Sequence, residues 1–327
     1  MEDSAFLRLK PYLASNAIVD CETEEIPICP IPVFTKGMQA NSYFFGHPEW
    51  GKEYLEASHR SEPFKERWQA VMGSWDDKIV VDIGCGPGNV HATLGGKPKL
   101  LIGVDISLGA LKMAREVGYT PILADAHHLP FVDGFADIVV ANATVHHCDD
   151  MGRILAEAAR LVRPGGLLFT DQDPQRTAWN LKGVGLFVRD IRYPLYRLLR
   201  SKHYISYEER QARWKTEVHN QRPGDGITKD VYYKALEPLG FDVELYPHSH
   251  DLGAEVLEGE NGRNSWRLRL SQCLSGINPD APEAAQSIMC IARRKNISSQ
   301  LCGFNDEKKK HFSPSFLSSP DNFGLVT

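Results

Sequence analysis

From residue 78 onward, short runs of apolar residues alternate with segments in which apolar residues recur at helical spacing. The short runs are rich in β-branched residues and end at acids or glycines, which is typical of buried strands. Strands are predicted in KIVVDIG (78–84), KLLIGVDIS (99–107), YTPILADA (119–126), ADIVVANA (136–143), LLFTDQD (167–173), FDVELYP (241–247) and SIMCIARR (287–294). Helices are predicted at 108–118, 151–162 and 231–239, with a turn at Arg163–Gly166. Apolar strands alternating with helices predict a parallel sheet covered on both faces.

Two regions fall outside this alternation. Residues 1–75 hold a proline-rich stretch and an aromatic segment, whose second half is predicted to be helical with Trp50, Tyr54, Phe64 and Trp68 available for burial. Residues 175–228 interrupt the strand–helix pattern. We therefore expect an N-terminal extension and cap at 1–75, a core at 76–175 and 229–295, an inserted lid at 176–228 and a disordered tail at 296–327.

The predicted lid contains an amphipathic helix. Its apolar positions are Val184, Phe187, Val188, Ile191 and Leu195, and the interleaved arginines are Arg189, Arg192, Arg197 and Arg200. The favoured interpretation is a helix that packs its apolar stripe on the core. There are two alternatives. One is a membrane-surface helix that gives access to a lipid or quinone, and the other is an anion-binding lid. Pro194 is expected to interrupt any single long helix, which favours a folded cap.

The turn after the first strand, VVDIGCGPGN, determines the class of ligand. Its glycines give G-x-G-x-G, and Asn89 stands where a dinucleotide fingerprint has its third glycine. Asp82 precedes the turn, and a pyrophosphate would gain nothing from a nearby carboxylate. A ligand with a cationic amine would gain. The turn therefore favours a nucleoside that bears an amino acid.

Two more acids stand at successive strand ends. Asp105 ends the second strand, where a carboxylate can accept hydrogen bonds from both ribose hydroxyls. Asp125 ends the third strand, where it can accept from the exocyclic amine of adenine. One such acid alone would be an ordinary solvated side chain. Three in order beside the glycine turn indicate a nucleoside site.

These motifs carry a resemblance to a known family. VDIGCGPGN, GVDIS, ADAHHLPF, ADIVVANATVHH and LVRPGGLLF resemble the successive motifs of class I S-adenosylmethionine-dependent methyltransferases of the small-molecule "type 11" kind. The resemblance is close over about 78–175 and looser over 229–294. It implies a Rossmann-like α/β fold with a seven-stranded sheet, mostly parallel with an antiparallel last strand. Helices would cover both faces, with an N-terminal and an inserted helical cap.

The resemblance also implies S-adenosylmethionine as cofactor and a role for each motif. The methionine part would be held by Asp82 and the turn, the ribose by the motif at Asp105, and the adenine by Asp125 with the Ala126 amide. Ala141 and Asn142 would touch the methionine end. The implied cofactor-binding residues are Asp82, Gly84, Cys85, Gly86, Gly88, Asp105, Ile106, Asp125, Ala126, Ala141 and Asn142.

A hydroxyl acceptor would need a base near neutral pKa, and His146 and His147 follow the fourth strand. The resemblance suggests that one of them is the base, with His146 slightly favoured and Asp171 or Asp173 assisting. The alternative is that the pair only shapes the pocket. His127 and His128 are expected to form pocket wall or surface. No metal is expected, because Asn142 replaces the acid that a metal site would need there.

The predicted function is methyl transfer to a small specialised metabolite, with oxygen slightly favoured as the acceptor. The alternatives are nitrogen or carbon methylation of a lipid or quinone-like substrate, and a cofactor-binding regulator or cyclase. Tyr43, Trp50 and Trp68 could shield the sulfonium, although core packing is favoured. The net charge of −5 gives no reason to expect nucleic acid.

Composition also bears on where the chain works. The seven scattered cysteines favour a reducing compartment, and the N-terminus lacks a secretory pattern. No stretch is apolar enough to span a membrane, while peripheral contact stays open. A cytoplasmic enzyme is therefore expected, and its oligomeric state is left open.

Overall fold

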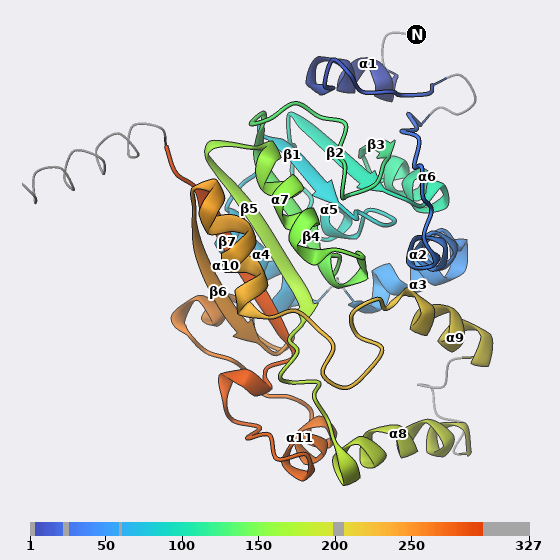
Figure 1. The fold of residues 1–327 in the computed structure, drawn as a ribbon, viewed down its shortest axis with the longest axis vertical. Coiled ribbons are helices and arrows are strands. Elements are labelled where there is room, and N and C mark those ends of the chain that lie inside the picture. Colours follow the sequence, from blue (N-terminus) through green and yellow to red (C-terminus); the bar gives the residue numbers. More distant parts are fainter. Residues whose placement is uncertain (1–3, 22–25, 59–60, 199–205, 297–327) are drawn as a thin grey trace, which may run out of the picture. The chain divides into compact units, whose positions relative to one another are not determined.

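The computed structural model describes residues 4–21, 26–58, 61–198 and 206–296. Seven strands form one sheet in the order β3-β2-β1-β4-β5-β7-β6 (Figure 1). They are β1 Ile79–Ile83, β2 Leu100–Asp105, β3 Thr120–Leu123, β4 Ala136–Asn142, β5 Val162–Pro174, β6 Phe241–His248 and β7 Ser287–Arg294. β7 runs antiparallel to both β5 and β6, and the remaining pairs are parallel. The predicted fold class is confirmed.

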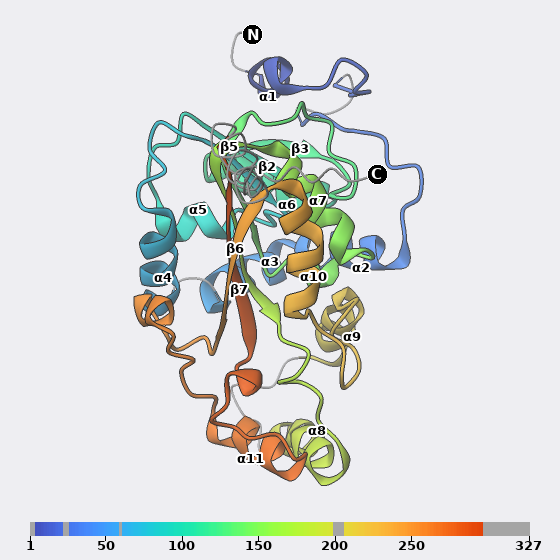
Figure 2. The same cartoon turned by 60° about the vertical axis from the view of Figure 1, so that its left-hand side comes forward.

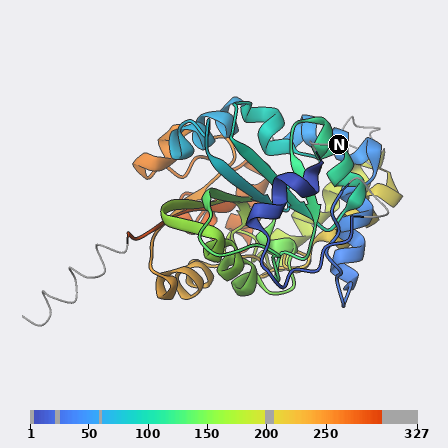
Figure 3. The ribbon, with the colours of Figure 1, turned by 90° about the horizontal axis from the view of Figure 1, so that it is seen from above.

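Helices cover both faces of the sheet. α4 (Glu62–Met72), α5 (Asn89–Leu94) and α6 (Leu108–Glu116) contribute apolar side chains to a core cluster on one face. α7 (Met151–Leu161) and α10 (Lys229–Leu236) contribute to the cluster on the other face, together with α1 (Ala5–Leu9). Figure 2 shows the blue α4 and cyan α5 on one side of the sheet, and the green α7 and orange α10 on the other, and Figure 3 shows the same layers from above.

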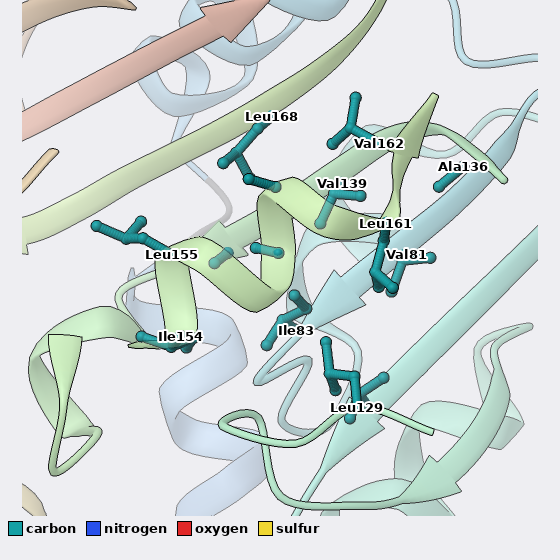
Figure 4. Close-up of a cluster of buried hydrophobic side chains, with 14 of the residues drawn as sticks. Val81, Ile83, Leu129, Ala136, Val139, Ile154, Leu155, Leu161, Val162 and Leu168 are labelled. Atoms are coloured by element: carbon teal, nitrogen blue, oxygen red, sulfur yellow. The ribbon is translucent and has the colours of Figure 1, made fainter. Parts of the chain in front are cut away.

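The alternation of side chains along each strand fills both clusters. Val81 and Ile83 of β1 face the α7 side, and Val80, which precedes Val81, faces the α4 side. Figure 4 shows Leu155 and Leu161 of α7 in the same cluster as Val81 and Ile83 of β1. Because successive strand residues point to opposite faces, an almost uninterrupted apolar strand is needed when both faces are covered.

The N-terminal segment forms three further elements before α4. These are η1 (Lys10–Tyr12), α2 (Lys36–Phe45) and α3 (Pro48–Ser58). Phe64 and Trp68 of α4 are fully buried, and the Trp68 ring lies 4.6 Å from that of Phe169 in β5. Trp50 stacks on His47, with 4.1 Å between ring centroids, while Tyr43 is exposed. Trp68 is therefore a core residue, as favoured.

The predicted insertion contains α8 (Gly183–Leu198) and α9 (Tyr207–Thr216). α8 runs through position 194, so the expectation that a proline there interrupts the helix is wrong. The favoured packing of its apolar stripe on the core is also wrong, because Val184, Phe187 and Ile191 are exposed. The helix packs instead on α11 (Trp266–Leu274) through small residues. Arg200 and the tail from 297 lie outside the described residues, as do the side chains of Arg192, Pro194, Leu195 and Arg197.

One predicted turn differs from the structure. Arg163–Gly166 belongs to β5, which starts directly after α7, and the pairing of β5 with β4 shifts register between Ala136 and Ile138. The remaining short helices are η2 (Val145–His147), η3 (Glu237–Leu239), η4 (Ala254–Glu258) and η5 (Pro282–Ala284). The proposed division of the chain into extension, core and lid stays a prediction.

Candidate functional site

A pocket opens at the carboxyl ends of β1 to β4. It encloses about 880 Å³, part of it open to solvent, which falls in the range of small-molecule sites. The strand ends supply the floor, while α2 and α3 supply Met38, Asn41, Phe45 and Tyr54. In an open parallel sheet this edge is the expected binding site, because the strand order reverses next to β1.

The turn after β1 requires its glycines. Gly84, Gly86 and Gly88 have φ of +68°, +53° and +94°, a region that other residues rarely adopt. A Cβ on Gly84 would lie 2.3 Å from the Thr144 Cγ2, and one on Gly88 would lie 2.4 Å from the Val117 Cγ2. A Cβ on Gly86 would meet nothing within 4 Å. Gly86 thus leaves its backbone open to a ligand in the pocket.

Asp82 is buried beneath this turn. Its Oδ2 accepts a 2.7 Å hydrogen bond from the Tyr119 hydroxyl, and its Oδ1 has no hydrogen-bond partner among the described residues. Burial raises the pKa of Asp82 to about 7, although the Tyr119 hydrogen bond opposes the shift. A buried acceptor without a donor is costly, and a cationic amine would satisfy it.

Asp105 connects the turn to the end of β2. Its Oδ2 accepts from the Gly86 N–H at 2.9 Å, and its Oδ1 accepts from the Ser107 N–H at 2.8 Å. Burial raises the pKa of Asp105, and these backbone hydrogen bonds oppose the rise. Each carboxylate oxygen retains a second lone pair, so the side chain can still accept from hydroxyls in the pocket.

Asp125 at the end of β3 is held by its neighbours. Its Oδ1 accepts from the His127 backbone N–H at 2.9 Å and lies 2.7 Å from the His127 Nδ1. Burial alone would raise the pKa of Asp125, but these His127 contacts outweigh it and lower the pKa. His127 lines the pocket and the His128 side chain is exposed, as the sequence predicts.

His147 lies in the pocket wall, beside the edge of the Phe45 ring. Its Nδ1 lies 2.7 Å from the Thr216 carbonyl oxygen, which can only accept, so Nδ1 carries the hydrogen and Nε2 keeps its lone pair. Burial, reinforced by the charge of His146, lowers the pKa of His147 to about 4. This imidazole is neutral at physiological pH.

His146 has the opposite environment. It is buried and is not among the pocket-lining residues. Its Nδ1 lies 2.8 Å from the Asp173 Oδ1, and its Nε2 lies 3.4 Å from the Glu217 Oε2. Burial lowers the pKa of His146, but the two carboxylates outweigh it and raise the pKa to about 9. The ring is therefore a cation at neutral pH, with hydrogens on both nitrogens.

Asp171 is placed away from the pocket. Its Oδ2 accepts from the Arg67 Nε at 3.0 Å and from the Trp68 Nε1 at 2.9 Å. Its Oδ1 accepts from the Gln172 N–H at 2.7 Å and lies 2.7 Å from the His248 Nε2. Burial would raise its pKa, but the charge of Arg67 leads a set of contacts that lowers it. The pairing predicted for Asp171 with the histidines belongs in this structure to Asp173.

Some of the other predicted residues also line the pocket, and some do not. Cys85, Ile106, Ala126 and Asn142 line the pocket. Gly88 and Ala141 do not line it, and Ala141 is buried within β4. Sequence reasoning missed the contributions of Phe45, Tyr54, Thr216 and Glu217. Phe45 and Tyr54 stand in the aromatic segment already singled out. No sequence signal marks Thr216 or Glu217, which follow from the position of α9.

One group of side chains could hold a metal ion. A ring nitrogen of His146, a ring nitrogen of His147 and an oxygen of Glu217 lie within 4.8 Å of one another. Asp171 and Asp173 are not in this group. The expectation that no metal takes part stays a prediction.

Comparisons with known proteins agree with this geometry. Residues 81–170 match a family model described as a methyltransferase domain. Malonyl-[acyl-carrier protein] O-methyltransferase of Yersinia pestis is 38% identical over 94 residues, covering 28% of this chain and 34% of that protein. Ubiquinone biosynthesis O-methyltransferase of Thiobacillus denitrificans is 31% identical over 119 residues, covering 34% and 51%. Malonyl-[acyl-carrier protein] O-methyltransferase of Legionella pneumophila is 32% identical over 220 residues, covering 58% and 78%.

The chain belongs to the class I S-adenosylmethionine-dependent methyltransferases. The Legionella protein decides this, since the similarity extends over most of its length. The chain spans from a third to about half of the length of the first curated relatives that it matches. No helix in the described part of the chain is both long enough and apolar enough to cross a membrane.

The pocket of this methyltransferase fits the cofactor of its family. No group in the described part of the chain donates to the Oδ1 of Asp82, and an ammonium group would supply a donor. Gly86 leaves room where any larger residue would project. Asp105 and Asp125 follow at the two neighbouring strand ends. The assignment of each residue to a part of the cofactor remains a prediction.

Proposed function

We propose that this methyltransferase transfers the methyl group of S-adenosylmethionine to an oxygen of a small-molecule acceptor. The observation that carries the proposal is the neutral imidazole of His147 in the pocket wall. Its hydrogen is committed to the Thr216 carbonyl, so the Nε2 lone pair can accept a proton from a hydroxyl. Because its pKa is lowered, His147 would be a weak base that is unprotonated at any physiological pH.

The cofactor would lie along the ends of β1 to β3. Asp82 would accept from its ammonium group, and the backbone at Gly84–Gly88 would lie against its methionine part. Asp105 would accept from the ribose hydroxyls, and Asp125 with Ala126 would hold the adenine. When bound, S-adenosylmethionine would supply a methyl group attached to a sulfonium sulfur. After the transfer this sulfur is part of a neutral thioether, which is a good leaving group. Alignment and exclusion of water are therefore the main tasks of the protein.

His146 acts in this proposal as a positioning residue. Asp173 and Glu217 keep a proton on its ring, and the resulting positive charge keeps the neighbouring His147 unprotonated. The centroids of the two rings lie only 4.0 Å apart, so the positive charge of His146 strongly disfavours a second positive charge on His147. Asp171 has no part in this mechanism, because Arg67 and Trp68 of α4 bind its carboxylate away from the pocket.

The N-terminal helices would close the pocket over the reactants. Phe45 and Tyr54 pack edge to face, with 5.4 Å between ring centroids, and both line the pocket. Burial raises the pKa of Tyr54 to about 12, so its hydroxyl stays protonated and can donate to an acceptor oxygen. This enclosure suits a small acceptor better than a nucleic acid.

Two further observations support the proposal. The three relatives described above are named O-methyltransferases, which favours oxygen as the acceptor atom. The described cysteines are free thiols, which suits a cytoplasmic enzyme. The described thiols are Cys21, Cys29, Cys85, Cys148, Cys273 and Cys290.

Incubation with methyl-labelled cofactor and a panel of phenols, carboxylic acids, amines and a cell metabolite extract tests the proposal. We expect label in an oxygen-bound methyl group, identified by mass spectrometry of the product. Label on nitrogen or carbon would refute the oxygen assignment. Tight cofactor binding in calorimetry without any transfer would favour a cofactor-binding regulator or cyclase instead.

A further inference from the structure

α8 and α11 lie side by side, although 67 residues separate the end of α8 from the start of α11 (Figures 1 and 2). Their contact depends on Gly185, where a Cβ would lie 2.1 Å from the Ser275 Oγ and 2.2 Å from the Ser271 carbonyl oxygen. The Lys182 N–H also donates to the Ser275 Oγ at 2.9 Å. The helices thus pack through small, polar residues, and their large apolar residues face elsewhere.

Both helices expose an apolar stripe. On α8, Val184, Phe187 and Ile191 are 61%, 63% and 47% exposed. On α11, Trp266, Leu270 and Leu274 are 69%, 43% and 45% exposed. Six of the fifteen exposed large apolar residues in the described part of the chain therefore lie on these two helices. We call these six residues the α8–α11 surface. A concentration of this kind usually marks an interaction site.

The charges around the α8–α11 surface identify its partner. Residues 182–198 and 261–280 contain seven lysines and arginines and two acids, in a chain whose net charge is −5. The two acids are each paired with an arginine, Asp190 with Arg189 at 2.7 Å and Asp280 with Arg269 at 2.8 Å, so the basic excess remains. Arg267 lies over the Trp266 ring, 5.3 Å from its centroid, so a basic group and an aromatic group are presented together.

A second copy of the chain would bring like charges together across such an interface, whereas an anionic lipid surface complements them. Basic residues beside exposed aromatic and aliphatic side chains on a helix are typical of proteins that lie on a membrane surface. We propose that the α8–α11 surface binds reversibly to anionic phospholipid bilayers. This is peripheral binding that goes beyond the proposed methyl transfer and does not depend on it.

Cosedimentation with lipid vesicles tests the proposal on the full chain. We expect binding to vesicles of phosphatidylcholine with phosphatidylglycerol, little binding to phosphatidylcholine alone, and weaker binding as salt increases. The double variant Phe187→Ser, Trp266→Ser should bind about tenfold more weakly or worse, because two large apolar side chains no longer enter the interface. Ile18→Ser with Val33→Ser, which removes two equally exposed apolar residues elsewhere, should bind like the parent.

Three results would overturn the proposal. One is no binding to anionic vesicles, and another is equal binding by the parent and the double variant. The third is a parent dimer in sedimentation equilibrium that the double variant converts to a monomer, since the surface would then join two copies of the chain. Unchanged cofactor affinity in calorimetry checks that each variant is folded. That measurement also separates this proposal from the methyl-transfer activity.

Discussion

The two ends of the pocket are built in different ways. At the proposed cofactor end, Asp82, Asp105 and Asp125 stand at the ends of successive strands, each within a short local motif. At the proposed acceptor end, the groups around His147 come from distant parts of the chain: Phe45 from α2 and Thr216 from the end of α9. One end is fixed by the fold of the sheet, and the other by how added helices pack on it.

In the proposed function, the sheet edge binds the cofactor that the family shares, and the added helices select the acceptor. The sheet edge can therefore stay the same while the helices change. The two adjacent histidines illustrate how finely the acceptor end is set. His146 has its pKa raised to about 9 by carboxylates, whereas burial lowers the pKa of His147 to about 4. Two neighbours in the sequence thus differ in charge at neutral pH, His146 being a cation and His147 neutral.

The largest effect should come from the acceptor end. We expect His147→Ala to lower kcat by about a hundredfold while leaving cofactor affinity unchanged, because it removes the proton acceptor and no cofactor contact. Steady-state kinetics with calorimetry would measure both quantities. Lys234→Ala, at an exposed residue of α10 that does not line the pocket, is the control and should leave both unchanged.

The pH profile of kcat tells the two histidines apart. A base with a pKa of about 4 is unprotonated throughout the physiological range, so activity should fall only as pH decreases toward 4. A limb with an apparent pKa near 9 would instead assign the base to His146. That result would reverse the roles proposed for the pair.

At the cofactor end, Asp82→Asn should weaken S-adenosylhomocysteine binding by about 10- to 100-fold, the usual cost of losing a hydrogen bond to a charged group. Tyr119→Phe removes only the neighbouring hydroxyl and should have a smaller effect. Because the pKa of Asp82 is raised to about 7, parent affinity should also decrease as pH falls below 7. Calorimetry across this range should show no such dependence in Asp82→Asn, and a persisting dependence would assign it to another group.

A smaller effect is expected on stability. The pKa of His146 is raised from 6.5 to about 9, so its stabilisation is complete below pH 6.5 and is lost as pH rises through 9. We expect the free energy of unfolding to decrease by on the order of 1–3 kcal/mol between these limits. Denaturant titrations at both pH values would measure it. His146→Gln should abolish most of this decrease, and an unchanged decrease would show that other groups cause it.

Removal of divalent metal should have the smallest effect. Both nitrogens of His146 are directed at carboxylates, so a metal would have to displace the proton held between His146 and Glu217. We expect kcat to be unchanged after dialysis against EDTA. Loss of activity that zinc or magnesium restores would instead make His146, His147 and Glu217 metal ligands.

Most of the sheet could be predicted because each strand is defined locally. The strand predicted at 287–294 has the same bounds as β7, and Gly240 ends η3 in the left-handed region as expected of a helix-stopping glycine. The orientation of α8 could not be predicted from its pattern. Apolar periodicity shows that a helix has an apolar face, but not whether that face meets the core or the surroundings.

The site shows the same limit. Strand ends placed Asp82 and Asp105 in the pocket, because their positions depend on the sheet alone. The roles expected of Asp171 and His146 depended on which side of β5 the Asp171 side chain faces and on what packs beside His146. Those partners, Arg67 and Glu217, lie more than seventy residues away in the sequence, and no local signal connects them.

The buried ion pair between Arg67 and Asp171 has a practical consequence for anyone shortening the protein. Arg67 and Trp68 both donate to this carboxylate from a helix that precedes the first motif of the family. A fragment starting near residue 76 would leave an anionic group in an apolar interior with two of its donors gone. The smallest piece that folds therefore has to begin upstream of α4, well before the region by which the family is recognised.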